Sequence, residues 1–264
     1  MIQIENLYKS FDGVEVLKGV SLQVERGEIL ALIGGSGHGK TLILKHVAGL
    51  MRPDRGRVDI NGKDVCSLGG NELEELRSHL GFLFQNGALF SSLTVYDNVA
   101  FPLREKTRLS EREIRDKVLT VLEQVGLKGA ESKYPAQISG GMIKRAALAR
   151  SLMRDPEIML FDEPTTGLDP VIAHTILDLI QLIHKELKFT GMIVSHELPR
   201  IFQIVQKVAM LHEGVVLLVG TPEEIMASRD PIVRQFTTEA LRVPPSAMKH
   251  FYQEYREERL RQKG

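Results

Sequence analysis

The stretch "LIGGSGHGKTLIL", from Leu32 to Leu44, decides the fold of this chain. Four glycines lie among the eight residues from Gly34 to Thr41, and apolar runs flank them on both sides. The residues fit the pattern G-x-x-x-x-G-K-[ST], which marks a phosphate-binding loop when a strand precedes it and a helix follows. Glycines let the backbone curl so that successive N–H groups point at phosphate oxygens. The start of the following helix adds partial positive charge.

The positions of this loop have separate expected roles toward a bound triphosphate. Lys40 is expected to reach the β- and γ-phosphates, and Thr41 to offer its hydroxyl to Mg²⁺. The side chain of His38 is expected to be incidental, because that position contributes a backbone N–H. The predicted nucleotide-binding residues of the loop are Gly34, Gly35, Ser36, Gly37, His38, Gly39, Lys40 and Thr41.

The overall composition sets limits on partners and compartment. The 264 residues include 34 basic and 34 acidic side chains, so no bulk charge attracts nucleic acid, and we expect no nucleic-acid partner. The one cysteine, Cys66, excludes an internal disulfide. The first residues lack the pattern of a signal peptide, and the longest charge-free stretch, Ser78 to Tyr96, is too polar to span a bilayer. These features predict a cytoplasmic protein.

Strand and helix patterns alternate along the chain and predict an α/β fold with a mostly parallel sheet covered on both faces. "MIQIENL" and "SLQVERGEILALIG" have the alternation of strands, and "GRVDINGKDV" is typical of a hairpin that turns at Asn61 and Gly62. Ser110 and Glu113 form a capping box for a helix over 110–126. "EIMLFDEP" is typical of a buried parallel strand that ends in two acids.

Two further motifs follow the glycine loop, "YPAQISGGMIKRAALARSL" and then "IMLFDEPTTGLDP". With them, over residues 1 to about 235, the chain resembles the ATP-binding subunit of an ABC transporter. The resemblance implies a P-loop NTPase (RecA-like) core with an antiparallel β subdomain and a helical subdomain over about 86–160. The ATP-binding domain is expected to span 1–237, followed by a C-terminal helical extension over 238–264.

The resemblance also implies the catalytic residues. Asp162 would hold Mg²⁺ through water, and Glu163 would be the general base for the attacking water, so that one acid serves the metal and the next serves the water. Gln85 would touch Mg²⁺ or the attacking water, and His196 would contact the γ-phosphate. The expected metal residues are Thr41, Gln85 and Asp162, and the expected catalytic residues are Glu163, His196 and Gln85.

Three further residues are expected to contact the adenine and ribose of the nucleotide or a neighbouring subunit. Phe11 resembles the aromatic residue that stacks on adenine, although Tyr8 is a rival for the same role. Val16 is expected to pack against the base or the ribose. Asp169 resembles an aspartate that crosses to a second subunit, and it also fits the N-cap of the helix that follows it.

The segment "ISGGM" resembles the ABC signature, whose serine and glycines open a helix and form a second anion-binding end. In this family that end faces the nucleotide bound by the opposite subunit. Ser139, Gly140 and Gly141 are therefore expected to bind nucleotide across a homodimer that encloses two ATP molecules.

The chain carries one ATPase unit, so the transport path is expected in a separate permease that docks in a groove near 86–103. Contact candidates in this groove are Leu89, Phe90 and Leu93. Met142 in "ISGGM", the sequence "FQNGALFSSLTVYDNVAFPL" and the C-terminal extension together resemble Mla/Mce-type phospholipid transport ATPases. That branch implies an MlaE-type permease, an MCE-domain lipid-binding protein and a peripheral place on the cytoplasmic face of the inner membrane. The alternative cargoes are amino acids or organic solvents. A role on DNA or ribosomes is disfavoured by the neutral charge.

The last part of the chain follows a proline break and has aromatic residues on one side of a polar helix, around Phe251 to Tyr255. One interpretation is that this side packs on a neighbouring ATPase subunit. The other is that the helix folds back on its own subunit or frays.

Overall fold

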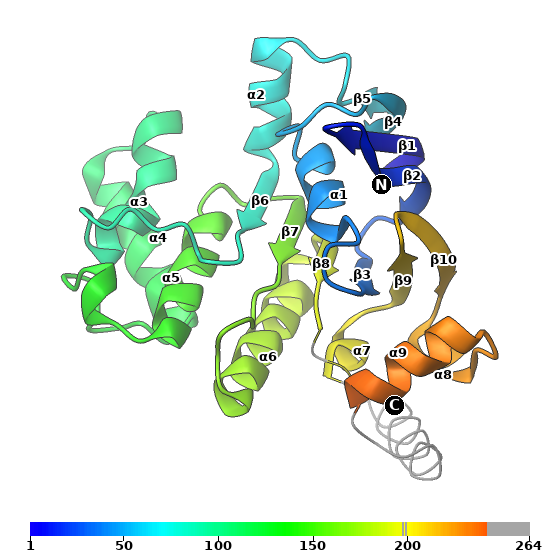
Figure 1. Cartoon of the computed structure of the whole chain (residues 1–264). Coiled ribbons are helices and arrows are strands. Elements are labelled where there is room, and N and C mark those ends of the chain that lie inside the picture. The colour runs from blue at the N-terminus through cyan, green and yellow to red at the C-terminus, as the bar shows by residue number, and fades with distance from the viewer. Residues whose placement is uncertain (197, 199, 242–264) are drawn as a thin grey trace.

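Two β-sheets organise the chain in the computed structural model, which describes residues 1–196, 198 and 200–241 (Figure 1). The smaller sheet is antiparallel and has the order β2-β1-β4-β5. Its strands are β1 (Ile2–Phe11), β2 (Val14–Val24), β4 (Arg55–Ile60) and β5 (Lys63–Asp64). Asn61 and Gly62 join β4 to β5 with φ of 51° and 83°, as a two-residue hairpin turn requires, so the predicted hairpin is confirmed.

The larger sheet has six strands in the order β10-β9-β3-β8-β7-β6. Neighbouring strands from β6 to β9 are parallel, and only the edge strand β10 runs antiparallel to its neighbour. The predicted mostly parallel sheet is therefore confirmed. Its strands are β3 (Ile29–Gly34), β6 (Leu80–Leu83), β7 (Ile158–Asp162), β8 (Thr190–Val194), β9 (Lys207–His212) and β10 (Val215–Gly220).

Nine α-helices lie in the described part of the chain, and Figure 1 shows α3, α4 and α5 grouped together at one side of the larger sheet. All three helices lie within residues 86–160. The helices are α1 (Lys40–Val47), α2 (Gly70–Ser78), α3 (Val95–Lys106), α4 (Glu111–Gln124), α5 (Gly140–Leu152), α6 (Pro170–Leu187), α7 (Arg200–Ile204), α8 (Pro222–Ala227) and α9 (Pro231–Leu241). None of the helices up to Leu241 has the length and apolarity that a membrane crossing requires.

The larger sheet divides the core in two, because side chains along β3 alternate between its faces. Leu30 and Leu32 pack with α1 and the antiparallel sheet. Ile29, Ala31 and Ile33 pack with the helices on the other side. Burial on both faces explains why the strand before the glycine loop is an unbroken apolar run.

The capping box predicted for α4 is present. The backbone N–H of Ser110 donates to Glu113 Oε2 at 2.8 Å, and the backbone N–H of Glu113 donates to Ser110 Oγ at 3.4 Å. One side of this helix is buried, as its spacing predicts, through Ile114, Val118, Val121 and Leu122. The aromatic stripe predicted around residues 251–255 lies outside the described residues.

Candidate active site

The glycine loop leaves the carboxyl end of β3 and enters α1, as the sequence predicts. Gly34 has φ of 138°, and a Cβ atom at this position would lie 2.1 Å from the carbonyl oxygen of Leu211 on β9. No side chain fits there, so glycine is required by both the backbone conformation and the close approach of β9. Gly39, directly before the helix, also has a left-handed conformation with φ of 94°. These two positions produce the curled backbone expected of a phosphate-binding loop.

Lys40 is buried inside this loop, with 5% of its surface exposed. Its Nζ donates hydrogen bonds to the carbonyl oxygens of Gly34 at 2.9 Å and Gly35 at 2.6 Å. Burial lowers the pKa of Lys40 below its ordinary value, although the nearby carboxylates oppose this effect. The loop therefore holds a cation at its centre, close to the N-terminus of α1.

Thr41 and Asp162 meet although 121 positions separate them in the sequence. The Thr41 hydroxyl donates to Asp162 Oδ1 at 2.7 Å. Burial raises the pKa of Asp162, and the hydrogen bond from Thr41 acts in the opposite direction. Hydroxyl and carboxylate oxygens are the ligands that Mg²⁺ prefers. The described residues contain no cluster of three or more His, Cys, Asp or Glu side chains that would hold a metal alone. The donor set thus fits Mg²⁺ bound jointly by protein, water and phosphate oxygens.

The carboxylate of Glu163 contacts Thr166 of its own loop and two other segments of the chain. Its Oε2 accepts a hydrogen bond from Gln85 Nε2 at 3.0 Å and another from Thr166 Oγ1 at 2.8 Å. Nε2 of His196 lies 2.9 Å from Oε1 of the same carboxylate. Gln85 follows β6, Glu163 follows β7 and His196 follows β8, so all three lie beyond the carboxyl ends of parallel strands. This edge is where open α/β sheets place their ligand sites.

The two aromatic candidates for stacking on a base have different surroundings. The guanidinium of Arg55 lies 4.0 Å from the ring centroid of Tyr8, whose ring is half-buried. Phe11 lies at the turn between β1 and β2 and is 41% exposed. A Cβ atom on Gly39 would lie 3.5 Å from Val16, which places Val16 beside the phosphate loop. Phe11 is the more exposed of the two candidates, and the cation beside its ring, Lys9 at 5.6 Å from the centroid, lies farther away than Arg55 does from Tyr8.

The signature segment contacts the segment around Asp169. Ser139 caps α5 by accepting a hydrogen bond from the backbone N–H of Met142 at 3.3 Å. A Cβ atom on Gly141 would lie 2.5 Å from Ile172 of α6, so α5 and α6 approach too closely for a larger residue. Asp169 caps α6 by accepting bonds of 3.1 Å from two backbone N–H groups. Within the described chain, no hydrogen bond joins residues 139–141 to residues 34–41.

Sequence reasoning missed two side chains near the site, Thr166 and Lys144, and it expected the side chain of His38 to be incidental. Thr166 bonds Glu163, and its only sequence signal is its place in "DEPTTGLDP". Lys144 is buried on α5 and reaches the backbone of the site. The ring of His38 packs edge-on against His212, with ring centroids 5.2 Å apart, so its side chain has a definite place on the loop.

A groove lies where β6 meets the helical subdomain, with a cavity volume of about 340 Å³. Its aromatic lining residues are Phe82, Phe84, Phe90 and Phe101. Phe90 and Phe101 belong to the segment predicted to form such a groove, and both are exposed. Among the other contact candidates, Leu89 packs against the core and Leu93 is half-buried.

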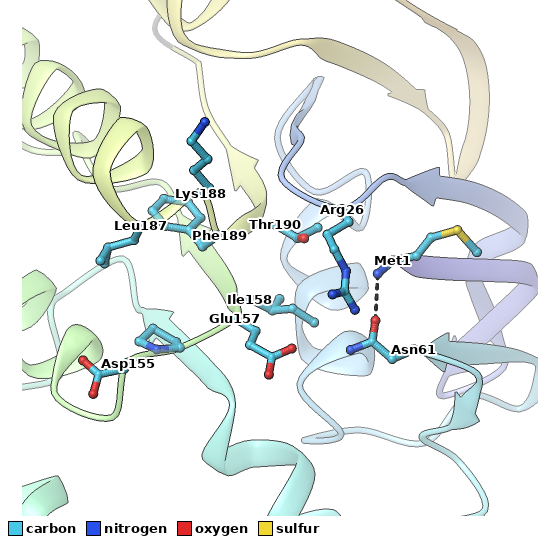
Figure 2. A pocket seen from close by; sticks show the side chains of 11 residues that line it. Met1, Arg26, Asn61, Asp155, Glu157, Ile158, Leu187, Lys188, Phe189 and Thr190 are labelled. Carbon is cyan, nitrogen blue, oxygen red and sulfur yellow. Dashed lines mark hydrogen bonds between the residues drawn. The ribbon is translucent and has the colours of Figure 1, made fainter.

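A second cavity, of about 330 Å³, lies at the amino ends of β7 and β8 in the larger sheet (Figure 2). The amine of Met1 donates to Asn61 Oδ1 at 2.9 Å at its rim. Arg26, Glu157 and Lys188 add charges of both signs to its lining. None of the predicted site residues lines this cavity. The predicted site residues therefore lie away from this cavity.

The fold and this network of side chains define a P-loop nucleoside triphosphatase of the cassette type. Residues 17–166 match the family described as ABC transporter, and the chain belongs to that family as an ATP hydrolase. The resemblance to ABC ATPases and the predicted fold class are thereby confirmed.

Two relatives and one solved structure illustrate the similarity. The intermembrane phospholipid transport system ATP-binding protein MlaF of Haemophilus influenzae is 43% identical over 237 residues, which cover 89% of each chain. The probable ribonucleotide transport ATP-binding protein mkl of Mycobacterium leprae is 44% identical over 89% of this chain and 68% of its own length. The structure is a dimeric ATP-binding cassette in a post-hydrolysis state with ADP and phosphate. It has a TM-score of 0.77 and 30% identity, and the match covers 84% of this chain and 99% of that one.

Proposed function

We propose that this chain hydrolyses ATP to drive phospholipid transport through a separate permease. The observation that carries the catalytic part is the cluster of Gln85, Glu163 and His196 beside the Thr41–Asp162 pair. The cargo is supported by the similarity to MlaF, whose name describes intermembrane phospholipid transport. The proposed ATP-binding domain is 1–237, and the proposed C-terminal extension is 238–264.

In this proposal the residues of the loop bind the triphosphate through backbone N–H groups and the ammonium of Lys40. Thr41, Asp162 and Gln85 would hold Mg²⁺, which supplies positive charge for the phosphate oxygens. Glu163 takes a proton from water while the water oxygen bonds to the γ-phosphorus and the bond to ADP breaks. His196 would donate to the γ-phosphate. Most of the catalysis is positioning and charge stabilisation.

We propose that the functional unit is a homodimer with two ATP molecules. The free helix end at Ser139–Gly141, which makes no hydrogen bond to its own phosphate loop within the described residues, is suited to bind a nucleotide held by a second copy. Asp169 lies exposed beside it and would contribute to the same interface. The similar solved structure is a dimeric ATP-binding cassette, and this similarity supports a dimer of the present chain. Phe11 and Val16 would pack against the adenine and ribose.

The proposed permease site is the aromatic groove that Phe84, Phe90 and Phe101 line. These rings lie among four basic side chains, Arg77, Lys106, Arg150 and Arg154, and one acidic side chain, Glu105. An apolar surface with a mainly basic rim suits a short amphipathic helix that carries acidic residues. An MlaE-type permease would place the chain on the cytoplasmic face of the inner membrane. An MCE-domain lipid-binding protein would complete the complex that moves lipid between inner and outer membranes.

The cargo test uses vesicles that contain the permease that co-purifies with the chain. ATP-dependent transfer of a fluorescent phospholipid, absent with Glu163→Gln, is the expected result. A second candidate cargo is a ribonucleotide, because the name of the mkl relative describes ribonucleotide transport. Uptake of labelled ribonucleotide, amino acid or solvent without lipid transfer would overturn the phospholipid proposal and leave the ATPase assignment intact.

A further inference from the structure

Lys144 is a buried lysine that the expected reaction does not use. It lies in α5, a little over one turn after the Ser139 cap, and only 5% of its surface is exposed. Lysine ordinarily keeps its ammonium in water, and a buried ammonium must be hydrogen-bonded. Burial lowers the pKa of Lys144, while Glu163 and Asp162 act in the opposite direction. The partners of this ammonium therefore decide what it does.

Both hydrogen-bond partners of Lys144 are backbone carbonyls of the site. Its Nζ donates to the carbonyl oxygen of Gln85 and, at 3.4 Å, to that of Glu163. Gln85 and Glu163 come from different loops, and their side chains also bond each other. One ammonium on α5 thus joins the two main-chain segments that carry the base and the amide beside it.

The rest of the Gln85 loop is held by the same helix. Arg150 donates to the carbonyl oxygens of Gly87 at 2.8 Å and Ala88 at 2.7 Å. A Cβ atom on Gly87 would lie 3.1 Å from Ile143 of α5, so the loop packs directly on the helix. The loop and α5 therefore behave as one unit, and Lys144 is the part of that unit that reaches Glu163.

The backbone of Glu163 needs such support. It has φ of 46°, a left-handed conformation that is unfavourable for a residue with a side chain and persists only where the surroundings hold it. Its N–H donates to Val194 O at 3.0 Å, and its carbonyl oxygen faces Lys144. This conformation sets the direction of the carboxylate toward Gln85 and His196. The two backbone bonds fix a strained residue at the centre of the site.

We propose that Lys144 is a positioning residue for ATP hydrolysis. Its ammonium fixes the main chains of Gln85 and Glu163 so that the Glu163 carboxylate faces the attacking water. Because α5 begins with Ser139–Gly141, the same helix joins the segment expected to touch one nucleotide to the base that acts on the other. This inference rests on the proposed role of Glu163 as general base.

The test compares Lys144→Met, Lys144→Arg and Lys144→Gln in the full-length chain. Methionine keeps most of the apolar volume of the side chain and removes its donor, so kcat is expected to fall at least about tenfold while KM for ATP changes less than about threefold. Arginine has donors for both carbonyls and is expected to keep at least about half of the wild-type kcat. Glutamine is uncharged and too short to reach both carbonyls, so its kcat should also fall, which keeps the test decisive if the methionine variant does not fold.

Arg145→Met is the matched control, because Arg145 is the next residue of α5 and its guanidinium donates to Gly126 O at 3.2 Å, away from the site. Its kcat is expected to stay within about twofold of wild type. Equal kcat values for Lys144→Met and Arg145→Met would overturn the inference. So would a loss accompanied by a lowered Tm, a raised KM and no rescue by arginine. If wild type hydrolyses ATP and Glu163→Gln does not, the proposed function stands whichever result Lys144 gives.

Discussion

The side-chain amide of Gln85 lies 3.0 Å from Oε2 of Glu163, although 78 positions separate the two residues. Gln85 follows β6 and is held by α5, whereas Glu163 follows β7 of the central sheet. The hydrogen bond therefore joins the loop that α5 holds to the segment that follows β7. A movement of α3–α5 that a permease imposes at the neighbouring aromatic groove would change the surroundings of the carboxylate directly. In the proposed complex, this hydrogen bond would couple permease contact to hydrolysis directly.

Glu163→Gln is expected to keep ATP binding and to stop turnover. Glutamine has the same shape and retains an acceptor for Gln85 or Thr166, but it cannot take a proton from water. General-base catalysis contributes a factor of about 10² to 10⁴, so phosphate release should fall at least about 100-fold. ATP should also hold the variant as a dimer in size-exclusion chromatography. Turnover near the wild-type rate would remove Glu163 from the base role.

Lys40→Ala should weaken ATP binding itself. Hydrogen bonds to charged groups contribute about 1.5–3 kcal/mol, which corresponds to a roughly 10- to 150-fold increase in Kd. Equilibrium titration with a fluorescent ATP analogue measures this change. Lys63→Ala, on the exposed strand β5, is the control and should bind as wild type does. An unaltered Kd for Lys40→Ala would contradict the proposed contact with phosphate.

Much of this fold follows from local patterns, and the site follows from motifs. The apolar run of β7 and the spacing of α4 predict their elements, because burial on both faces or on one side leaves a clear periodicity. The helix α2 was not predicted. It has no buried residue and a glycine, Gly69, as its N-cap, and only Leu73 and Leu76 pack against the core, so its sequence gives a weak signal.

Lys144 and the groove were harder to predict for a different reason. A lysine in a helix ordinarily indicates a face exposed to solvent. Lys144 is buried only because α5 packs against the Gln85 loop, which the sequence does not show. Phe84 and Phe101 line the groove from separate elements, so neither residue marks it alone. The sequence predicts that Thr41 and Asp162 both serve Mg²⁺. It does not predict their 2.7 Å hydrogen bond, because the spacing of two residues along the chain does not give the distance between them.

Asp162→Asn should raise the Mg²⁺ concentration needed for turnover. Asparagine keeps an acceptor for the Thr41 hydroxyl but removes the negative charge that attracts the cation. The Mg²⁺ midpoint of phosphate release is expected to rise at least about tenfold, which is a loss of about 1.4 kcal/mol. Binding of ATP in EDTA should be equal to wild type or tighter, because a carboxylate near the phosphates is gone. Asp155→Asn, which loses only its ion pair with Lys117, is the control. An unchanged Mg²⁺ midpoint would exclude Asp162 from the metal site.

Phe11→Ala and Tyr8→Leu distinguish the two aromatic candidates. Stacking of a base on an aromatic ring contributes about 1–3 kcal/mol, so loss of the Phe11 ring should raise the Kd for ATP roughly 5- to 150-fold. Tyr8→Leu should change the Kd less than about threefold, because the Tyr8 ring already stacks with Arg55. Titration with ATP and with inorganic triphosphate separates base contacts from phosphate contacts. The reverse order of effects would assign the base to Tyr8.

His46 should make the protein less stable in mild acid. The residue is 1% exposed on α1, and burial lowers its pKa below the ordinary 6.5. The unfolded chain therefore takes up a proton first as the pH falls, so stability is complete above pH 6.5 and declines between 6.5 and the lowered pKa. Each such group changes the free energy of unfolding by up to about 1.4 kcal/mol per pH unit.

Urea unfolding of wild type and His46→Gln at pH 7.5 and 5.5 measures the effect. The difference in unfolding free energy between the two pH values should be smaller for the variant, because glutamine does not titrate. His184→Gln is a matched variant, since burial also lowers the pKa of His184, and the double variant should reduce the difference further. Equal pH dependence in wild type and in both single variants would mean that neither histidine differs in proton uptake between the folded and unfolded chain.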